Sequence, residues 1–260
     1  MIQLRGIGHD VAMSTLERDA DSIGDRSVFS ALSFDHWAAV AGGLQRFTAA
    51  DGPPPPAEAI PFRPTVRGSM ALLRIVDDGS EDGEVIRIRQ ERIVVGRGGA
   101  DVVVPHDISM SAHHAAIERL GDSGWRLRDL GSTGGTFVRV TTARLRDGTV
   151  LQVGRTRLRF QAVDLTEAWL IEEWPDRPGV LHECHAPATA IGRVGGGGGI
   201  NLDDPFVSPV HAAVHRTPRG WTIENTGMNG LWVRIEAPVR MAAPSQFLCG
   251  EQRFVFIPCG

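Results

Sequence analysis

The feature that most constrains the fold of this chain is an internal repeat with a period of about 96 residues. Four landmarks recur in the same order, at offsets of 95 to 97 residues: Gly96-Arg97 as Gly192-Arg193, Ser111 and His114 as Ser208 and His211, Gly124-Trp125 as Gly220-Trp221, and Gly135 and Val138 as Gly230 and Val233. An offset this steady over a whole unit indicates a duplicated domain, because solenoid repeats have much shorter periods.

Both copies consist of short segments that alternate apolar with polar residues and are broken by Gly, Asp and Ser. Examples are MALLRIV, RIVVGR, HAAIERL and RTRLRF in the first copy, and AWLIEEW, HAAVHR, GWTIEN and QRFVFIP in the second. This pattern is typical of β-strands, and no segment of normal helix length interrupts either run. The sequence therefore predicts an all-β protein with two β-sandwiches in tandem, over residues 68–163 and 164–260.

A different texture precedes the repeats. Residues 1–50 form an N-terminal extension, polar and irregular over 1–30, where partial disorder is expected. Apolar residues recur at helical spacing near 33–47, and Ser33 suits the N-cap of such a helix. Its apolar face would either pack on a sandwich or dock on a partner. The Pro-rich residues 51–67 cannot continue a helix and predict an extended linker.

Composition excludes several classes of function. All 27 basic residues are Arg, so the chain lacks the Lys that a Walker phosphate loop or a Schiff-base enzyme needs. The net charge of -4 does not favour nucleic acid, and no apolar run is long enough to insert into a membrane. Only three cysteines are present, and no signal peptide is evident, so we expect a cytoplasmic protein without disulfides. The Arg-, Ala- and Gly-rich composition is typical of a GC-rich bacterial genome.

The landmarks combine into a recognisable pattern. In each copy a strand ends in Gly-Arg, a Ser-x-x-His follows 14 or 15 residues later, and a glycine-containing turn such as GSTGG or TGMNG comes next. In this order and spacing the motifs resemble the forkhead-associated (FHA) domain, over about residues 70–258. The resemblance implies two β-sandwiches whose loops at one end bind phosphothreonine in an extended segment of a partner protein.

In the first copy the resemblance implies that Arg97, Ser111 and Thr133 are phosphate ligands. Arginine offers a permanent charge and a fixed fork of donors, and a hydroxyl adds a short neutral donor. Two positions depart from the family pattern. Ala112 stands where Arg or Asn is frequent, and Gly134 stands where an Asn usually holds the peptide backbone. The phosphate ligands are thus kept, while the hold on the peptide backbone is weakened.

The second copy departs in the opposite way. It keeps Arg193, Ser208 and Asn229, which the resemblance assigns to phosphopeptide binding. Met228, however, replaces the hydroxyl ligand, and Pro209 follows the Ser. Residues 164–260 also carry 7 Arg against 11 acidic residues, whereas residues 70–163 carry 14 against 12. We therefore expect the first copy to be the better phosphate site and the second to be mainly a protein-docking platform.

Other motifs invite enzymatic or metal-binding interpretations. His114 and His211 follow serines, but the resemblance implies that they brace the recognition loop, and no third residue is placed to orient either as a base. The HECH segment, residues 182–185, could contribute to a zinc site, but a fourth ligand is not evident. The glycine run from 195 to 199 does not match a dinucleotide-binding motif. We expect no enzyme activity, no metal and no cofactor.

Two functions remain open from the sequence. The chain is either a phosphothreonine-dependent adaptor that acts downstream of a Ser/Thr kinase, or a phospho-independent structural subunit. In the second case degenerate domains would serve as docking surfaces in a larger assembly, such as a bacterial secretion or contractile machine. Retention of Arg97, Ser111 and Thr133 favours the adaptor, whereas Gly134 and Met228 favour the structural subunit.

Overall fold

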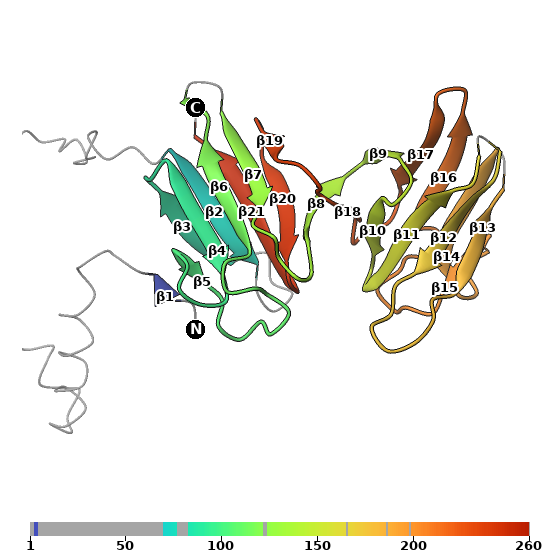
Figure 1. The fold of residues 1–260 in the computed structure, drawn as a ribbon, viewed down its shortest axis with the longest axis horizontal. Coiled ribbons are helices and arrows are strands. Elements are labelled where there is room, and N and C mark those ends of the chain that lie inside the picture. Colours follow the sequence, from blue (N-terminus) through green and yellow to red (C-terminus); the bar gives the residue numbers. More distant parts are fainter. Residues whose placement is uncertain are drawn as a thin grey trace, which may run out of the picture. The chain divides into compact units, whose positions relative to one another are not determined.

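The computed structural model describes residues 3–4, 70–76, 83–121, 124–164, 166–185, 187–197 and 199–259. This part of the chain is all-β, as the sequence predicts, and contains no α-helix (Figure 1). None of its segments forms a helix long and apolar enough to cross a membrane. The helix expected near 33–47 and the linker expected over 51–67 lie outside the described residues.

The strands fall into three sheets. The first has the order β1-β5-β4-β6-β7-β19, the second β13-β12-β11-β10-β18-β8-β20-β21-β2-β3, and the third β15-β14-β16-β17-β9. The strands are β1 (Gln3–Leu4), β2 (Ala71–Val76), β3 (Glu84–Ile88), β4 (Arg92–Gly96), β5 (Val102–Val103), β6 (Ala115–Arg119), β7 (Trp125–Asp129), β8 (Thr136–Val140), β9 (Thr142–Leu145), β10 (Val150–Val153), β11 (Thr156–Ala162), β12 (Ala168–Glu172), β13 (Leu181–Cys184), β14 (Ala188–Arg193), β15 (Ile200–Leu202), β16 (Ala212–Thr217), β17 (Gly220–Asn225), β18 (Leu231–Arg234), β19 (Val239–Met241), β20 (Ser245–Cys249) and β21 (Gln252–Pro258). Strand β1 lies in the extension that the sequence predicts to be irregular, and it pairs with the short strand β5.

The two sandwiches do not coincide with the two sequence repeats. Strand β2 of the first repeat pairs with β21 of the second, and β7 of the first pairs with β19 of the second. Strand β17 of the second repeat pairs in turn with β9 of the first. The repeats have therefore exchanged their last strands. One sandwich, here called sandwich I, is built from the described residues of 70–140 and 235–259, and the other, sandwich II, from the described residues of 142–234.

This exchange corrects the expectation of contiguous sandwiches over 68–163 and 164–260, and its physical basis is the equivalence of the strands exchanged. Trp125 of the first repeat packs edge-on against Phe256 of the second, with ring centroids 5.5 Å apart. The equivalent Trp221 of the second repeat packs against Phe160 of the first, with centroids 6.1 Å apart. Both tryptophans are buried, as expected for core residues. Each core thus joins residues of both repeats.

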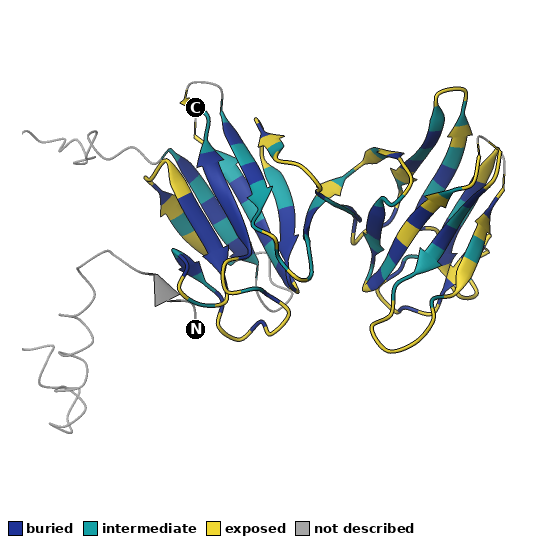
Figure 2. Cartoon of the chain, viewed as in Figure 1, coloured by how far each residue is buried: buried dark blue, intermediate teal, exposed yellow. Residues whose placement is uncertain are grey.

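The burial pattern agrees with this division. Alternate residues of the sandwich strands are buried, as in β2, where they face the core of sandwich I (Figure 2). That core joins residues 71–127 with residues 235–256, whereas the core of sandwich II runs from Leu145 to Leu231. A third, smaller cluster of buried residues lies on the central strands of the ten-stranded sheet: Phe137, Val150, Trp232 and Leu248.

Two buried carboxylates hold the exchanged hairpins. Asp107, only 8% exposed, accepts hydrogen bonds from the backbone N–H groups of Glu251 and Gln252 at 2.8 and 3.2 Å, in the β20–β21 turn. Its counterpart Asp204, 4% exposed, accepts hydrogen bonds from the β10–β11 turn in the same way. Each carboxylate comes from one repeat and caps a turn of the other, so it satisfies donors that burial would otherwise leave unpaired.

A residue with a side chain would not fit the first of these turns. Gly250 has a φ of 64°, and a Cβ built on it would lie 2.4 Å from Oδ2 of Asp107. Glycine is required there for both its backbone conformation and its size.

The exchange can be tested with engineered cysteines at a strand pair. Arg74 and Val255 are direct partners in the β2–β21 ladder, whereas Arg159 is the residue of the first repeat equivalent to Val255. In a Cys259→Ser background, the pair Arg74→Cys with Val255→Cys should form an intramolecular disulfide under mild oxidation, because directly paired residues lie within disulfide range. Peptide mapping by mass spectrometry would identify the linkage. Formation of the disulfide by Arg74→Cys with Arg159→Cys instead would show that each repeat closes on itself.

Candidate functional site

The recognition loops of the first repeat are brought together by the backbone. Arg97 follows β4 directly, and its N–H donates to the carbonyl oxygen of Ser111 at 3.0 Å. The N–H of Thr133 donates to Oγ of Ser111 at 3.1 Å. The three residues expected as phosphate ligands thus lie on adjoining loops. Arg97 and Thr133 are exposed, and Ser111 is half-buried between them.

The Ser111 hydroxyl accepts this one hydrogen bond, from the Thr133 N–H, and a serine hydroxyl can also donate its own proton. The Arg97 guanidinium makes no ion pair with any of the described carboxylates. Among the described residues, these loops therefore present an arginine without a carboxylate partner close to the hydroxyls of Ser111 and Thr133.

His114 lies beneath these loops and is fully buried. Its Nδ1 accepts a hydrogen bond from the Ser111 N–H at 3.1 Å, so Nε2 carries the proton and donates to the carbonyl oxygen of Gly135 at 3.1 Å. Burial lowers the pKa of His114, which agrees with a neutral ring. The ring joins the Ser111 loop to the Thr133 loop, and both of its nitrogens are used in that contact. Neither is left to act as a base.

Asp129, which does not belong to the motifs recognised in the sequence, fixes the turn that carries Thr133. Its carboxylate accepts hydrogen bonds from the backbone N–H groups of Gly131 and Ser132 and from the hydroxyls of Ser132 and Thr136, at 2.6 to 2.9 Å. Burial acts to raise the pKa of Asp129, but these hydrogen bonds outweigh it and hold the pKa below its usual value. The signal available in the sequence was the spacing of Asp129, Ser132 and Thr136 around a turn.

The second repeat reproduces the same frame with different chemistry at its surface. The Arg193 N–H donates to the Ser208 carbonyl oxygen at 3.0 Å. His211 is buried, with Nδ1 accepting from the Ser208 N–H at 3.0 Å and Nε2 lying 2.9 Å from the carbonyl oxygen of Gly230. The Met228 N–H reaches Oγ of Ser208 at 3.3 Å, just as Thr133 reaches Ser111 in the first repeat.

The side chains beyond this frame distinguish the second repeat. Met228 is 87% exposed and places a thioether where the first repeat has a hydroxyl. The Asn229 amide is already engaged, because its Nδ2 donates to the carbonyl oxygen of Phe206 at 2.8 Å. The carbonyl oxygen of Met228 accepts from Arg139 at 3.2 Å, an arginine of β8 in the first repeat. The loop of the second repeat is therefore held partly by the first.

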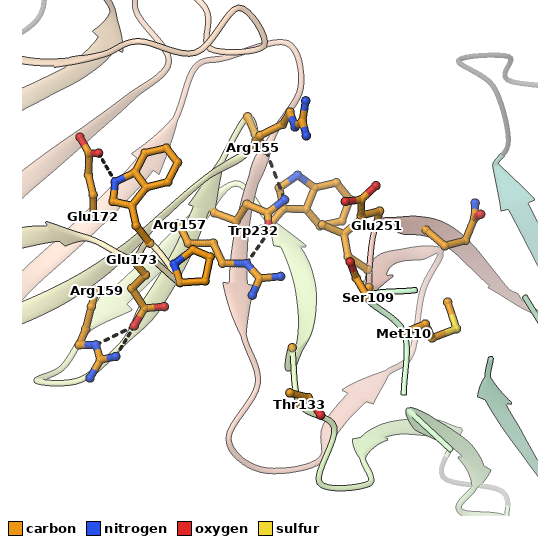
Figure 3. Close-up of a pocket in the computed structure, with 18 of the residues that line it drawn as sticks. Ser109, Met110, Thr133, Arg155, Arg157, Arg159, Glu172, Glu173, Trp232 and Glu251 are labelled. Atoms are coloured by element: carbon orange, nitrogen blue, oxygen red, sulfur yellow. Dashed lines mark hydrogen bonds and ion pairs between the residues drawn. The ribbon is translucent and has the colours of Figure 1, made fainter. Parts of the chain in front are cut away.

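A cleft of about 1950 Å³ adjoins the loops of both repeats (Figure 3). Its lining includes Arg97, Ser111 and Thr133 together with three arginines of the β10–β11 hairpin that lie outside the recognised motifs: Arg155, Arg157 and Arg159. Arg159 is neutralised by an ion pair with Glu173. The signal in the sequence was the alternation RTRLR, which places these arginines on one face of a strand.

The other motifs have structural explanations. His182 pairs with Glu172, with Nε2 and Oε1 2.8 Å apart, and Cys184 is buried in the core, where burial raises its pKa to about 11. The described residues contain no cluster of ligands able to hold a metal ion. In the glycine run, a Cβ on Gly196 would lie 2.2 Å from the carbonyl oxygen of Pro209, so this loop packs closely against the Ser208 loop.

Both repeats are similar in sequence to a known domain family. The sequence model of the FHA domain matches residues 93–154 and 189–246. The chain is 33% identical over 99 residues to the FHA domain-containing protein FhaB of Mycobacterium tuberculosis, which corresponds to 36% of this chain and 63% of the relative. The match therefore spans less than two thirds of that relative's length.

Solved structures are also similar to this chain. The FHA domain of the CT664 protein from Chlamydia trachomatis is 14% identical with a TM-score of 0.34, and the match covers 73% of this chain and 98% of that one. A chain from a structural and functional analysis of phosphothreonine-dependent FHA domain interactions is 32% identical with a TM-score of 0.23. That match covers 36% of this chain and 97% of the solved one.

The buried His114 predicts a pH dependence of stability. Its folded-state pKa lies below 6.5, so the unfolded chain takes up the proton first as the pH falls. The free energy of unfolding should decrease as the pH is lowered through about 6.5, by up to about 1.4 kcal/mol per pH unit for this group. His114→Gln should make this slope shallower, because the buried imidazole is then absent. Urea unfolding between pH 7.5 and 5 would measure the slopes, and identical slopes for the wild type and the variant would contradict the prediction.

Proposed function

We propose that this chain, which belongs to the FHA domain family, is an adaptor that binds a partner protein phosphorylated on threonine. FHA domains are protein-interaction modules, and an arginine cluster that reads a phosphorylated motif is their general mode of recognition. The observation that carries the proposal is the convergence of Arg97, Ser111 and Thr133 on adjoining loops, where Arg97 makes no ion pair with any described carboxylate and the Ser111 hydroxyl lies beside Thr133.

The chemistry of this set matches a phosphothreonine. The phosphate carries a charge of about -1.5 to -2 and three acceptor oxygens, so it needs a permanent cation and several donors. The Arg97 guanidinium supplies the cation in a fork that can contact two oxygens, and the Ser111 and Thr133 hydroxyls supply neutral donors. The rigid support from His114 and Asp129 reduces the ordering that binding would require.

The proposal includes a division of labour between the repeats. Met228 removes a donor from the second site and exposes an adaptable apolar side chain, which suits contact with a protein surface better than contact with a dianion. The second repeat then acts mainly as a docking platform, while the first gives the phosphate dependence. A partner that engages both would gain avidity. The phosphate on such a partner would come from a Ser/Thr kinase acting upstream.

A second candidate function is phospho-independent docking by both repeats within a larger assembly. It is favoured by Gly134, which lacks the amide that usually holds the peptide backbone, and by Met228. In that case neither repeat would distinguish a phosphorylated segment from an unmodified one.

Replacing Arg97 tests the phosphate site. Arg97→Ala should weaken binding of phosphothreonine peptides by about 2 to 5 kcal/mol, roughly 30-fold to several thousandfold, because a charge-assisted contact to the phosphate is lost. Fluorescence anisotropy with a degenerate phosphothreonine peptide library would measure the affinities. Arg193→Ala, the equivalent change in the second repeat, is the matched control and should have little effect. Equal binding by wild type and Arg97→Ala would leave phospho-independent docking as the better explanation.

Replacing Met228 tests the division of labour. In the Arg97→Ala background, where the first site is silenced, Met228→Thr should increase phosphothreonine-peptide affinity by about tenfold to a hundredfold, because a hydrogen bond to a charged group contributes about 1.5 to 3 kcal/mol. Met228→Leu, which restores no donor, should give no increase. The division of labour fails if Arg97→Ala alone already binds phosphothreonine peptides tightly and loses them upon addition of Arg193→Ala.

A further inference from the structure

Gly134, which stands in the first recognition loop where an Asn is usual, lies beside an arginine from another part of the chain. A Cβ built on Gly134 would lie 3.6 Å from the carbonyl oxygen of Ser109 and 3.9 Å from Nη2 of Arg157. Arg157 belongs to β11, which pairs with β10 and β12 in sandwich II. A guanidinium therefore stands next to the space that the missing Asn side chain would occupy.

Arg157 is held in place from below. Its guanidinium carbon lies 5.1 Å from the centre of the Phe137 ring, and its Nε donates to Oε1 of Gln152 at 3.4 Å. Phe137 is itself buried in the small cluster on the central strands. The contact of the guanidinium with an aromatic ring and one hydrogen bond restrain the side chain, whose Nη2 lies on the side of Gly134. Figure 3 shows Arg157 reaching into the cleft on the side where Thr133 lies.

The charge of Arg157 is not neutralised by contact. Among the described residues no carboxylate lies within ion-pair distance of it, since Glu173 is bound to Arg159. Burial lowers the pKa of Arg157, and the more distant Glu173 and Glu251 raise it while Arg234 lowers it. An arginine remains charged after such a shift. The half-buried Arg157 guanidinium, which has no direct counterion among the described residues, therefore lines the cleft beside Gly134, the residue that follows Thr133.

We infer that Arg157 is a specificity-determining residue of the first repeat and selects phosphothreonine segments with an anionic side chain near the phosphothreonine. The inference rests on the proposed function of Arg97, Ser111 and Thr133. An amide at position 134 would hold a backbone carbonyl of any sequence, whereas a guanidinium beside a bare glycine prefers a carboxylate or a second phosphate. In place of an amide that binds the peptide backbone of any sequence, this site has a guanidinium whose binding depends on the charge of the peptide side chains.

The strand exchange brings Arg157 to this site from the other sandwich. Arg157 and Gly134 both belong to the first sequence repeat, but they lie in different sandwiches joined through the pairing of β18 with β8 and β10. The equivalent of Arg157 in the second repeat is Arg253, which also lines the cleft. Arg253 therefore serves as a matched control of the same residue type in an equivalent strand.

The test compares three phosphothreonine peptides that differ only in their flanks, with neutral residues, with Glu, or with phosphoserine, bound to the full chain and followed by fluorescence anisotropy. The wild-type chain should bind one or both anionic peptides about tenfold more tightly than the neutral one. Arg157→Gln should abolish this preference while changing the affinity for the neutral peptide less than threefold. Arg253→Gln should keep the preference. The Glu and phosphoserine arms show which anion the site takes.

Three outcomes overturn the inference, and each is separable from failure of the proposed function. A wild-type chain with equal affinity for neutral and anionic flanks overturns it without any variant. If Arg157→Gln lowers the affinity for all three peptides equally, Arg157 only packs on Phe137 and does not select the flanking residues. If Arg253→Gln loses the preference for anionic peptides and Arg157→Gln keeps it, Arg253 and not Arg157 is the specificity-determining residue. The proposed function itself fails if Arg97→Ala leaves binding of the neutral phosphothreonine peptide intact, an outcome that differs from these three.

Discussion

The pairing of β8 with β18 is the contact on which the rest of this structure depends. Val138 lies opposite its own repeat equivalent, Val233, so the ladder has the symmetry of the duplication at its centre. If the two sandwiches were separate, each of these strands would have one edge with unpaired backbone N–H and C=O groups. Such an edge can pair with other chains and cause aggregation. Here the two strands satisfy each other, and a single ten-stranded sheet runs through both sandwiches.

The same contact links the two recognition loops. A Cβ on Gly230 would lie 2.4 Å from Nε of Arg139, and one on Gly135 would lie 2.6 Å from Cδ of Arg234. Each arginine comes from the central strand of the opposite repeat and packs against the glycine that ends the other repeat's loop. Glycine at these two positions has a positive φ as well, so the turn and the interface impose the same requirement.

The sequence predicts the fold class and the loop motifs better than it predicts which strands pair with one another. The all-β class, the duplication and the shared loop positions of Arg97, Ser111 and Thr133 follow from motifs whose geometry is local. The exchange does not, because β11 and β21 carry the same alternating pattern and either could complete the ladder of β2. Arg157 was missed for a related reason: 23 positions separate it from Gly134, and only the pairing of strands from both repeats brings the two together.

The exchange has a consequence for how the chain reaches this fold. Strand β2 pairs with β21, so Ala71 and Pro258 enclose almost the whole described chain in one loop, whereas the alternative partner β11 lies about half as far along the sequence. Closing the longer loop costs only about 0.6 kcal/mol more, too little to determine which partner is used at equilibrium. Synthesis at about 5 to 20 residues per second, however, presents β11 to β2 several seconds before β21 exists. A β2–β11 pairing formed during synthesis would therefore have to open before β21 could take its place.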